Sequence, residues 1–123
     1  MSAKHILLVD DDVEFAKMVE FLLESRDYKV HLAHTGAEAF DRVKRGPDLI
    51  LLDCNLPDMD GFEVCSKLKS DPKTEKIPII ATTAAGMDDI EHRCLTAGAD
   101  DCIRKPYEAS DLLSKIRGIL LIK

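Results

Sequence analysis

The chain has 123 residues, of which 46% are hydrophobic and 33% are charged, and its formal net charge is −6 at pH 7. This composition excludes an intrinsically disordered chain, and no apolar stretch approaches the ~20 residues that a membrane helix needs. An acidic balance without a basic stripe also argues against direct contact with DNA or RNA. The length predicts a single domain that covers residues 1–123.

The first part of the chain predicts two strand–helix units. Apolar runs at residues 6–9 and 30–33 predict the strands, and each is followed by a segment with helical spacing. The apolar positions of the two helical segments are Phe15, Ala16, Val19, Leu22 and Leu23, then Ala39, Phe40 and Val43. Thr35 and Glu38 form a capping box at the start of the second helix, and Gly46 followed by proline ends it.

Three further units follow. Runs at residues 49–52 and 79–81 and a weaker run at 102–103 predict the strands, and continuous apolar runs are typical of strands buried on both faces of a parallel sheet. The apolar positions of the helical segments are Phe62, Cys65 and Leu68, then Ile90 and Cys94, then Leu112, Leu113, Ile116 and Leu120. Asp71 followed by proline ends the third helix, and Gly98 ends the fourth.

Polar side chains lie at the carboxyl ends of most of these strands. Strand–helix alternation predicts an α/β fold with a parallel sheet, and such sheets bind ligands beyond the carboxyl ends of their strands. The polar residues at these ends are Asp10, Asp11 and Asp12 after the first strand, Asp53 after the third, Thr82 and Thr83 on the fourth, and Lys105 after the fifth.

These acids predict a cation site. Carboxylates that meet at one sheet edge repel one another unless a proton or a cation neutralises them, and hard oxygen ligands favour Mg²⁺. Asp12 is expected to cap the first helix, which leaves Asp10 and Asp11 for the metal. The interpretation requires Asp53 to lie close to both and to be open to solvent.

Four segments, at residues 9–12, 48–61, 78–84 and 98–106, resemble in their order and spacing the receiver domains of two-component response regulators. The resemblance is chemotaxis-regulator-like and covers almost the whole chain. It implies a flavodoxin-like (βα)5 three-layer sandwich with a parallel sheet of strand order 2-1-3-4-5.

The resemblance also implies roles at the acidic edge. Asp53 would be the phosphoacceptor that forms an aspartyl-phosphate. Asp11 would bind Mg²⁺ directly, Asp10 largely through water, and Asn55 through its backbone carbonyl, and Asp53 would belong to the same metal site.

A second group of residues would bind the phosphoryl group and report on it. Lys105 would pair with the carboxylate and later with a phosphate oxygen, Thr83 would supply the switch hydroxyl, and the small Ala84 would leave the site open. The family usually has Tyr or Phe three residues before the lysine, where this chain has Cys102, so we expect an output face that still moves but has an unusual or weak switch at Cys102.

Partners follow from the same resemblance. The phosphodonor would be a histidine kinase or a phosphotransfer protein, or a small phosphodonor. An output partner would bind the face of the fourth helix, fifth strand and fifth helix, which includes His92, Arg104 and Arg117. We expect a monomer or a weak phosphorylation-dependent dimer, in contact with neither nucleic acid nor membrane. The kinase, the output partner and the existence of a longer regulator stay open at this point.

One enzyme remains as an alternative, a Mg²⁺-dependent phosphohydrolase on a related α/β fold. A calcium loop through Asp58 and Asp60 is excluded, because Lys67 stands where the loop needs glutamate, and a turn with a helix cap is expected there. The four histidines lack metal spacing, and we expect His31 and His34 on the surface.

The four cysteines are Cys54, Cys65, Cys94 and Cys102, and none form a CxxC pair. No secretory signal precedes the first apolar run, so we expect reduced, mostly buried thiols in a cytoplasmic protein. Cys54 is expected to point away from Asp53 into the core.

Overall fold

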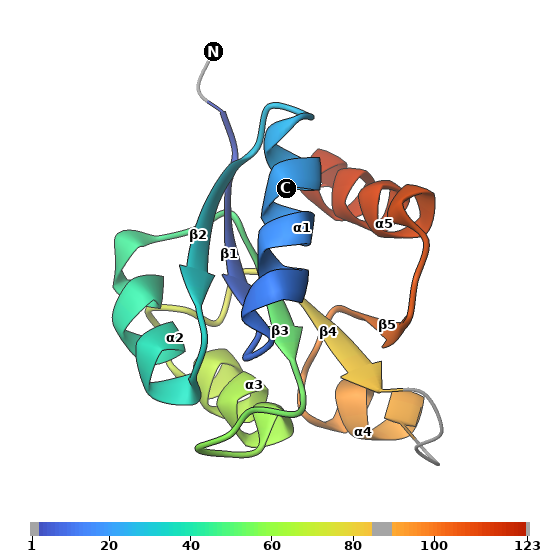
Figure 1. Cartoon of the computed structure of the whole chain (residues 1–123). Helices are drawn as coiled ribbons and strands as arrows, with labels where there is room; N and C mark the ends of the chain where they lie inside the picture. Colours follow the sequence, from blue (N-terminus) through green and yellow to red (C-terminus); the bar gives the residue numbers. More distant parts are fainter. Residues whose placement is uncertain (1–2, 85–89, 123) are drawn as a thin grey trace.

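The structure is a computed structural model that describes residues 3–84 and 90–122. Within these residues it has five parallel strands in the order β2-β1-β3-β4-β5, which confirms the predicted flavodoxin-like (βα)5 fold. The strands are β1 (His5–Val9), β2 (Lys29–Ala33), β3 (Leu49–Asp53), β4 (Ile79–Ala84) and β5 (Asp101–Lys105). The arrows of β1 to β4 point the same way in Figure 1, so their carboxyl ends share one edge.

Helices cover both faces of the sheet (Figure 1). They are α1 (Val13–Glu24), α2 (Gly36–Arg42) with the short 3₁₀ turn η1 (Val43–Arg45), α3 (Gly61–Ser70), α4 (Ile90–Thr96) and α5 (Ala109–Ile122). Helices α1 and α5 bury their apolar faces in one core cluster, and α2, α3 and α4 bury theirs in the other. The result is the expected three-layer sandwich.

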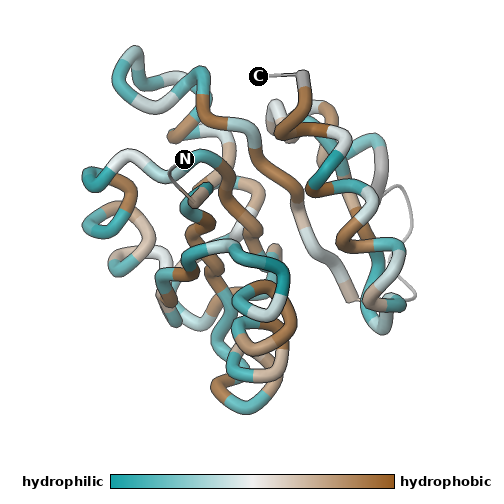
Figure 2. Tube along the Cα trace, turned by 90° about the horizontal axis from the view of Figure 1, so that it is seen from above, coloured by the Kyte–Doolittle hydropathy of each residue, from teal (hydrophilic) through white to brown (hydrophobic). Residues whose placement is uncertain are grey.

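Strand β3 lies at the centre of the sheet and is buried along its whole length. Its residues alternate between the two cores: Leu49 and Leu51 pack beneath α1 and α5, whereas Ile50 and Leu52 pack beneath α2, α3 and α4. Figure 2 shows hydrophobic segments, coloured brown, in the interior of the molecule between the helical layers. The continuous apolar run at 49–52 is explained by this burial on both faces.

The strand bounds are wider than the apolar runs at the edge of the sheet. Strand β5 runs from Asp101 to Lys105, although only residues 102–103 were expected, because backbone pairing with β4 extends it. Lys105 is therefore the last residue of the strand rather than the residue that follows it. Among the described helices, none combines the length and apolar character that crossing a bilayer requires.

The predicted caps are largely confirmed. The Asp12 carboxylate accepts a hydrogen bond from the Phe15 N–H at the start of α1, and the Thr35 hydroxyl accepts one from the Glu38 N–H at the start of α2. The capping box is wrong in its second half: the Glu38 carboxylate accepts from the N–H of His34 and not from that of Thr35. Its side chain reaches one residue further back along the chain.

Candidate functional site

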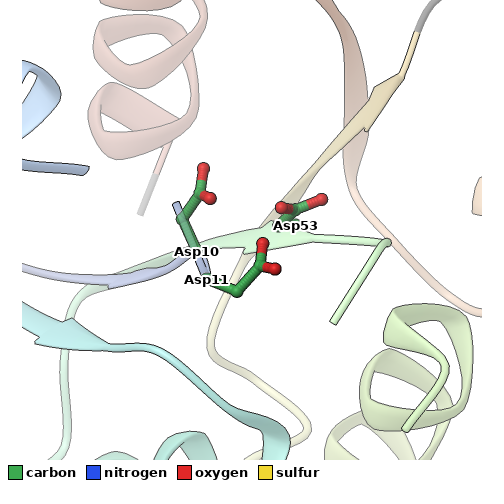
Figure 3. Close-up of side chains that lie close together, drawn as sticks. All are labelled: Asp10, Asp11 and Asp53. Carbon is green, nitrogen blue, oxygen red and sulfur yellow. The ribbon is translucent and has the colours of Figure 1, made fainter. Parts of the chain in front are cut away.

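The fold brings together three of the acids that the sequence selected. Asp10 and Asp11 directly follow β1, and Asp53 ends the neighbouring strand β3. One carboxylate oxygen from each lies within 4.8 Å of the others, and Figure 3 shows the three side chains gathered at the ends of these strands. The predicted proximity of Asp53 to Asp10 and Asp11 is confirmed.

Lys105 reaches this group from the end of β5. Its Nζ lies 2.7 Å from Asp10 Oδ2 and 3.3 Å from Asp53 Oδ2, so a single ammonium group bridges two carboxylates. The same Nζ lies 4.7 Å from the centre of the Phe15 ring, which adds a cation–π contact from α1. The predicted pairing of Lys105 with the phosphoacceptor carboxylate is present.

Backbone N–H groups hold the other oxygen of each buried carboxylate. Asp10 Oδ1 accepts a hydrogen bond from the Asp12 N–H, and Asp53 Oδ1 accepts one from the Asn55 N–H, both at 2.9 Å. The backbone carbonyl of Asp10 is in turn 2.8 Å from Nδ1 of His34. Both carboxylates are thus fixed in orientation by the loops that follow their strands.

Asp53 is more enclosed than the sequence predicts. Its exposed fraction is 4% and that of Asp10 is 1%, whereas Asp11 is exposed. The open phosphoacceptor that we expected is therefore wrong in degree, because Asp53 ends the central strand and Lys105 lies against its outer oxygen.

Burial and charge act on the pKa values in opposite directions here. Burial raises the pKa of Asp53, against the opposing effects of the Asn55 N–H and the Lys105 ammonium, and nearby Asp10 adds to the rise. Burial alone would lower the pKa of Lys105, but its hydrogen bond to Asp10 and the charges of Asp53 and Asp10 raise it overall. The lysine is therefore held in its charged form.

The donor set fits a divalent cation. Three carboxylates face a single ammonium group, which leaves an excess of negative charge among hard oxygen ligands. Mg²⁺ commonly takes one or two carboxylates, with water and phosphate oxygens completing its coordination. Exposed Asp11 gives the site an open side for such ligands.

A groove of about 560 Å³ adjoins the acids. Its lining includes Asp11 and Asn55, together with Asp58, Asp60 and Arg93. Asn55 and Asp11 thus line the same groove, and the metal role of Asn55 stays a prediction. Asp10 and Asp53 do not line the groove, which lies next to the buried carboxylates rather than around them.

The two threonines of β4 differ in position. Thr82 is the register partner of Asp53, whereas Thr83 pairs with Arg104 of β5. Thr83 is fully buried, and among the described residues its Oγ1 is the one buried side-chain oxygen or nitrogen without a hydrogen-bond partner. Ala84 ends the strand and is partly buried. The residue that follows the register partner of Asp53 therefore carries a buried hydroxyl group, that of Thr83, which has no hydrogen-bond partner.

Sequence reasoning missed the role of Gly61. A Cβ placed on Gly61 would lie 2.4 Å from both the Asp53 carbonyl oxygen and Cys54 Cα, so α3 begins directly against the backbone of Asp53 and Cys54. The Gly61 N–H also donates to the Cys54 carbonyl at 3.0 Å. The signal was present in the sequence as a glycine that directly follows an expected helix cap.

The neighbouring aspartates are caps, as expected. Asp60 accepts from the Phe62 N–H at the start of α3, and Asp58 accepts from the N–H groups of Gly36 and Ala37 at the start of α2. The hydrogen bonds from Gly36 and Ala37 lower the pKa of Asp58. That Asp58 caps a distant helix could not be read from spacing along the chain.

The histidines agree with the expected surface placement. His31 and His34 are both half-buried at the surface. His31 stacks on His5 with ring centroids 5.2 Å apart, and His34 contacts the Asp10 carbonyl. Cys54 packs in the core beneath α2, α3 and α4, as predicted, and Cys102 contacts the same core.

Comparison with known proteins identifies the family. The sequence model of the response regulator receiver domain matches residues 6–117. This chain belongs to the response regulator receiver domain family. It is a receiver domain of the two-component type, and the alternative reading as a phosphohydrolase is not favoured.

Named relatives agree with this assignment. The receiver domain is 37% identical over 116 residues to the DNA-binding dual master transcriptional regulator RpaA of Synechocystis sp., a match that covers 94% of this chain and 48% of that protein. The chain spans about half the length of the curated relatives it matches. Because RpaA is named as DNA-binding, the expected absence of nucleic-acid contact gains no support and stays a prediction.

Solved structures share the fold over almost the whole chain. A CheY-like response regulator receiver domain protein of Methanospirillum hungatei has a TM-score of 0.89 and 34% identity, and the match covers 97% of this chain and 94% of that one. The receiver domain of the sensor histidine kinase PA1611 of Pseudomonas aeruginosa has a TM-score of 0.88 and 31% identity, with 97% and 98% covered. That structure contains a magnesium ion coordinated in its active-site cleft.

Proposed function

We propose that this receiver domain accepts a phosphoryl group on Asp53 from a phosphohistidine on a histidine kinase or phosphotransfer protein, or from a small phosphodonor. The observation that carries the proposal is the contact of Lys105 Nζ with both Asp10 and Asp53, beside a third carboxylate within 4.8 Å. This arrangement suits phosphoryl transfer, in which catalysis is mainly positioning and charge stabilisation.

The reaction assigns a task to each residue. A carboxylate oxygen of Asp53 attacks the phosphorus, a new P–O bond forms, and the bond from phosphorus to the donor nitrogen or oxygen breaks, with the electron pair leaving on the donor. Lys105 stabilises the negative charge on the phosphoryl oxygens, and the Asn55 N–H keeps Asp53 in orientation. Asp10, Asp11 and Asp53, with the Asn55 carbonyl, would hold Mg²⁺, which would supply further positive charge to the phosphoryl oxygens.

Loss of the phosphoryl group is part of the same proposal. Water attacks the phosphorus of the aspartyl-phosphate, and the Asp53 carboxylate leaves with the electron pair of the broken P–O bond. Ala84, at the end of β4, is too small to block this approach. The protein would therefore catalyse only its own phosphorylation and dephosphorylation, as a switch and not as an enzyme that turns over an external substrate.

Thr83 is the residue that we propose reports phosphorylation. A buried hydroxyl without a partner costs about 1–3 kcal/mol, so the Thr83 side chain gains by moving to a phosphoryl oxygen. The register partner of Asp53 is Thr82, which supplies a matched control. Thr83→Ala should abolish the chemical-shift changes that a phosphate analogue induces in residues 90–107, whereas Thr82→Ala should leave them. The reverse result would assign the switch to Thr82.

An apolar surface beside the site is the proposed dock for the phosphodonor protein. A groove of about 560 Å³ between α1 and the β5–α5 connection is lined by Phe15, Met18 and Tyr107, and by Phe21, which is 78% exposed. Phe15 also contacts Lys105, so a partner bound here lies next to the acids. Phe21→Ala should slow phosphotransfer from a protein donor and leave phosphorylation by acetyl phosphate unchanged. If phosphorylation by acetyl phosphate slowed as well, Phe21 would act on the phosphorylation site and not on docking of the donor protein.

The output partner is proposed to bind the face of α4, β5 and α5. On this face His92, Arg104 and Arg117 are exposed, and Leu95 is 69% exposed. The face offers positive charge around an apolar centre, which suits an acidic partner with an apolar anchor. We also propose that this chain acts as one receiver domain over residues 1–123, as a monomer or a weak phosphorylation-dependent dimer, without itself contacting nucleic acid.

The four cysteines bear on where the protein acts. All are free thiols, and free thiols are typical of a reducing compartment. We therefore keep a cytoplasmic location as part of the proposal.

The function is tested with acetyl phosphate and Mg²⁺. A receiver should gain one phosphoryl group per chain, and the added mass should be released by hydroxylamine, which cleaves acyl phosphates. A phosphohydrolase would instead release phosphate from a phosphomonoester over many turnovers. Stoichiometric, hydroxylamine-labile modification supports the proposal, and sustained turnover without it would replace the proposal with the hydrolase.

A further inference from the structure

Two thiols meet on the side of the sheet opposite to the acids. The Sγ atoms of Cys94 on α4 and Cys102 on β5 lie 3.0 Å apart, with the Cys94 thiol donating to Cys102. Cys94 is 1% exposed, whereas Cys102 is partly buried. Neither residue takes part in the proposed phosphoryl transfer.

We propose that Cys94 and Cys102 are a redox modification site at which a peroxide oxidant forms a reversible disulfide between α4 and β5. The two sulfurs are already adjacent, and closure requires an approach from 3.0 Å to a bond length of about 2.0 Å. Only eight positions separate the cysteines along the chain, so the disulfide would lock a local contact instead of joining distant parts of the fold.

The unequal surroundings of the two thiols assign their order of reaction. Cys102 is the more accessible thiol, so it meets the oxidant first. Burial, together with the hydrogen bond to Cys102, raises the pKa of Cys94 to about 12, so its thiol is protonated and protected from direct attack. Cys94 therefore acts as the resolving cysteine.

The steps balance with hydrogen peroxide as the two-electron oxidant. The Cys102 sulfur attacks one peroxide oxygen, the O–O bond breaks, and Cys102 sulfenic acid and water are formed. The Cys94 sulfur then attacks the sulfenic sulfur, an S–S bond forms, and the sulfenic oxygen leaves as a second water with the thiol proton. A dithiol reductant reverses the change by thiol–disulfide exchange.

The location gives the disulfide a consequence, which rests on the proposed function. Cys102 lies three residues before Lys105 on β5, at the position where the family usually has an aromatic switch residue. A bond to α4 would fix the α4–β5 contact within the proposed output face. Oxidation would then oppose the movement of this face while leaving the acids and Lys105 in place.

A third thiol sets the main competing outcome. Cys54 packs in the same core, and its proximity opposes the rise in the Cys94 pKa. Cys54 is 5% exposed, and burial raises the pKa of its thiol. Of the cysteines that act on Cys94, namely Cys54, Cys65 and Cys102, only Cys102 is more than marginally accessible.

The experiment treats the whole unphosphorylated chain with a small excess of hydrogen peroxide and measures its intact mass under non-reducing conditions. The wild type should lose the mass of its two thiol hydrogens, about 2 Da, and regain it with dithiothreitol. Peptide mapping should place the bond between Cys94 and Cys102. Cys102→Ser should form no disulfide and should therefore show no loss of about 2 Da. Cys65→Ser and Cys54→Ser should lose this mass as the wild type does.

Two results would overturn the inference: an unchanged mass in the folded wild type, or a bond mapped to Cys54 and Cys94. Because disulfide formation is read by mass without any phosphodonor, its failure is distinct from a failure of the proposed function. Oxidised and reduced protein should take up phosphate from acetyl phosphate at rates within about twofold, since the acids are unchanged. Only the reduced form should show the chemical-shift changes that a phosphate analogue induces in residues 90–107.

Discussion

Two consecutive residues at the end of β3, Asp53 and Cys54, lie in opposite environments, one charged and one apolar. Asp53 meets Lys105 and the acids after β1, whereas Cys54 packs among apolar side chains beneath α2, α3 and α4. Burial raises the pKa of both side chains. For Asp53, the Lys105 ammonium group and the Asn55 N–H oppose the rise in pKa. For Cys54, burial keeps the thiol in its neutral form.

The difference shows how the alternation of side chains along a strand separates a charged site from a packed core at two consecutive residues. The peptide between Asp53 and Cys54 is shared, and Gly61 presses against it from the start of α3. A charged, ligand-binding side and a well-packed apolar side can coexist there only because successive side chains point to opposite faces. Substitutions on each side should therefore have effects of different size and sign.

The largest expected effect comes from removing the cation on the charged side. Lys105→Met leaves the buried carboxylates of Asp10 and Asp53 without their cationic partner, so the free energy of unfolding should fall by about 3–5 kcal/mol. The matched control is Lys115→Met, which breaks a half-exposed pair with Asp101 and should cost about 1 kcal/mol or less. Urea unfolding measures both, and equal losses would show that Lys105 is not a special partner of the acids.

The next largest effect is expected from a substitution that crowds the peptide between Asp53 and Cys54. Gly61→Ala would place a methyl group against the backbone of Asp53 and Cys54, and should lower the free energy of unfolding by about 1–3 kcal/mol through overpacking. The control is Gly118→Ala in α5, where nothing lies within 4 Å and where alanine should stabilise the helix by up to about 1 kcal/mol. If the two variants shifted the melting temperature in the same direction, the close approach would be disproved.

On the apolar side the loss should be smaller. Cys54→Ala removes one buried sulfur from a packed core, and the free energy of unfolding should fall by about 1 kcal/mol. Phosphorylation of Asp53 should continue, because the thiol lies on the far face of the strand. Loss of phosphorylation in a folded Cys54→Ala protein would contradict the separation of the two faces.

The smallest effect should have the opposite sign. Asp53→Asn removes a buried charge whose pKa is raised by burial, and without Mg²⁺ it should raise the melting temperature by roughly 2–6 °C. Added Mg²⁺ should stabilise the wild type more than the variant, since the variant lacks one carboxylate ligand. A variant that melts lower than the wild type would make Asp53 a structural hydrogen-bond acceptor.

The same pair of proteins gives a pH dependence. The carboxyl of Asp53 titrates near pH 4 in the unfolded chain and higher in the folded one, so the folded state binds more protons in that window. Wild-type stability should therefore fall, relative to Asp53→Asn, as the pH rises from about 4 through the raised pKa. A stability difference that stays constant from pH 4 to 8 would contradict the raised pKa.

Much of this arrangement could be predicted from the sequence because it depends on periodicity and order. Continuous apolar runs fixed the buried strands, and the position of Asp10, Asp11 and Asp53 directly after such runs was enough to predict that they meet. The Asp12 cap followed from local spacing alone. The expectation of Mg²⁺ rested on the same carboxylates.

Features that depend on distant contacts could not be predicted. The burial of Asp53 results from its place on the central strand and from Lys105, which lies 52 positions away along the chain. Asp58 caps a helix 22 positions before it, and the thiol contact of Cys94 with Cys102 requires the packing of α4 on β5. No local pattern encodes how closely two such surfaces approach.

The most direct test of the central claim is to locate the phosphoryl group. After incubation with acetyl phosphate and Mg²⁺, borohydride reduces an aspartyl-phosphate to homoserine, and peptide sequencing by mass spectrometry identifies the converted residue. Conversion is expected at Asp53 alone, and no conversion is expected in Asp53→Asn. Conversion at Asp10 or Asp11 in the wild type, with Asp53 unchanged, would contradict it.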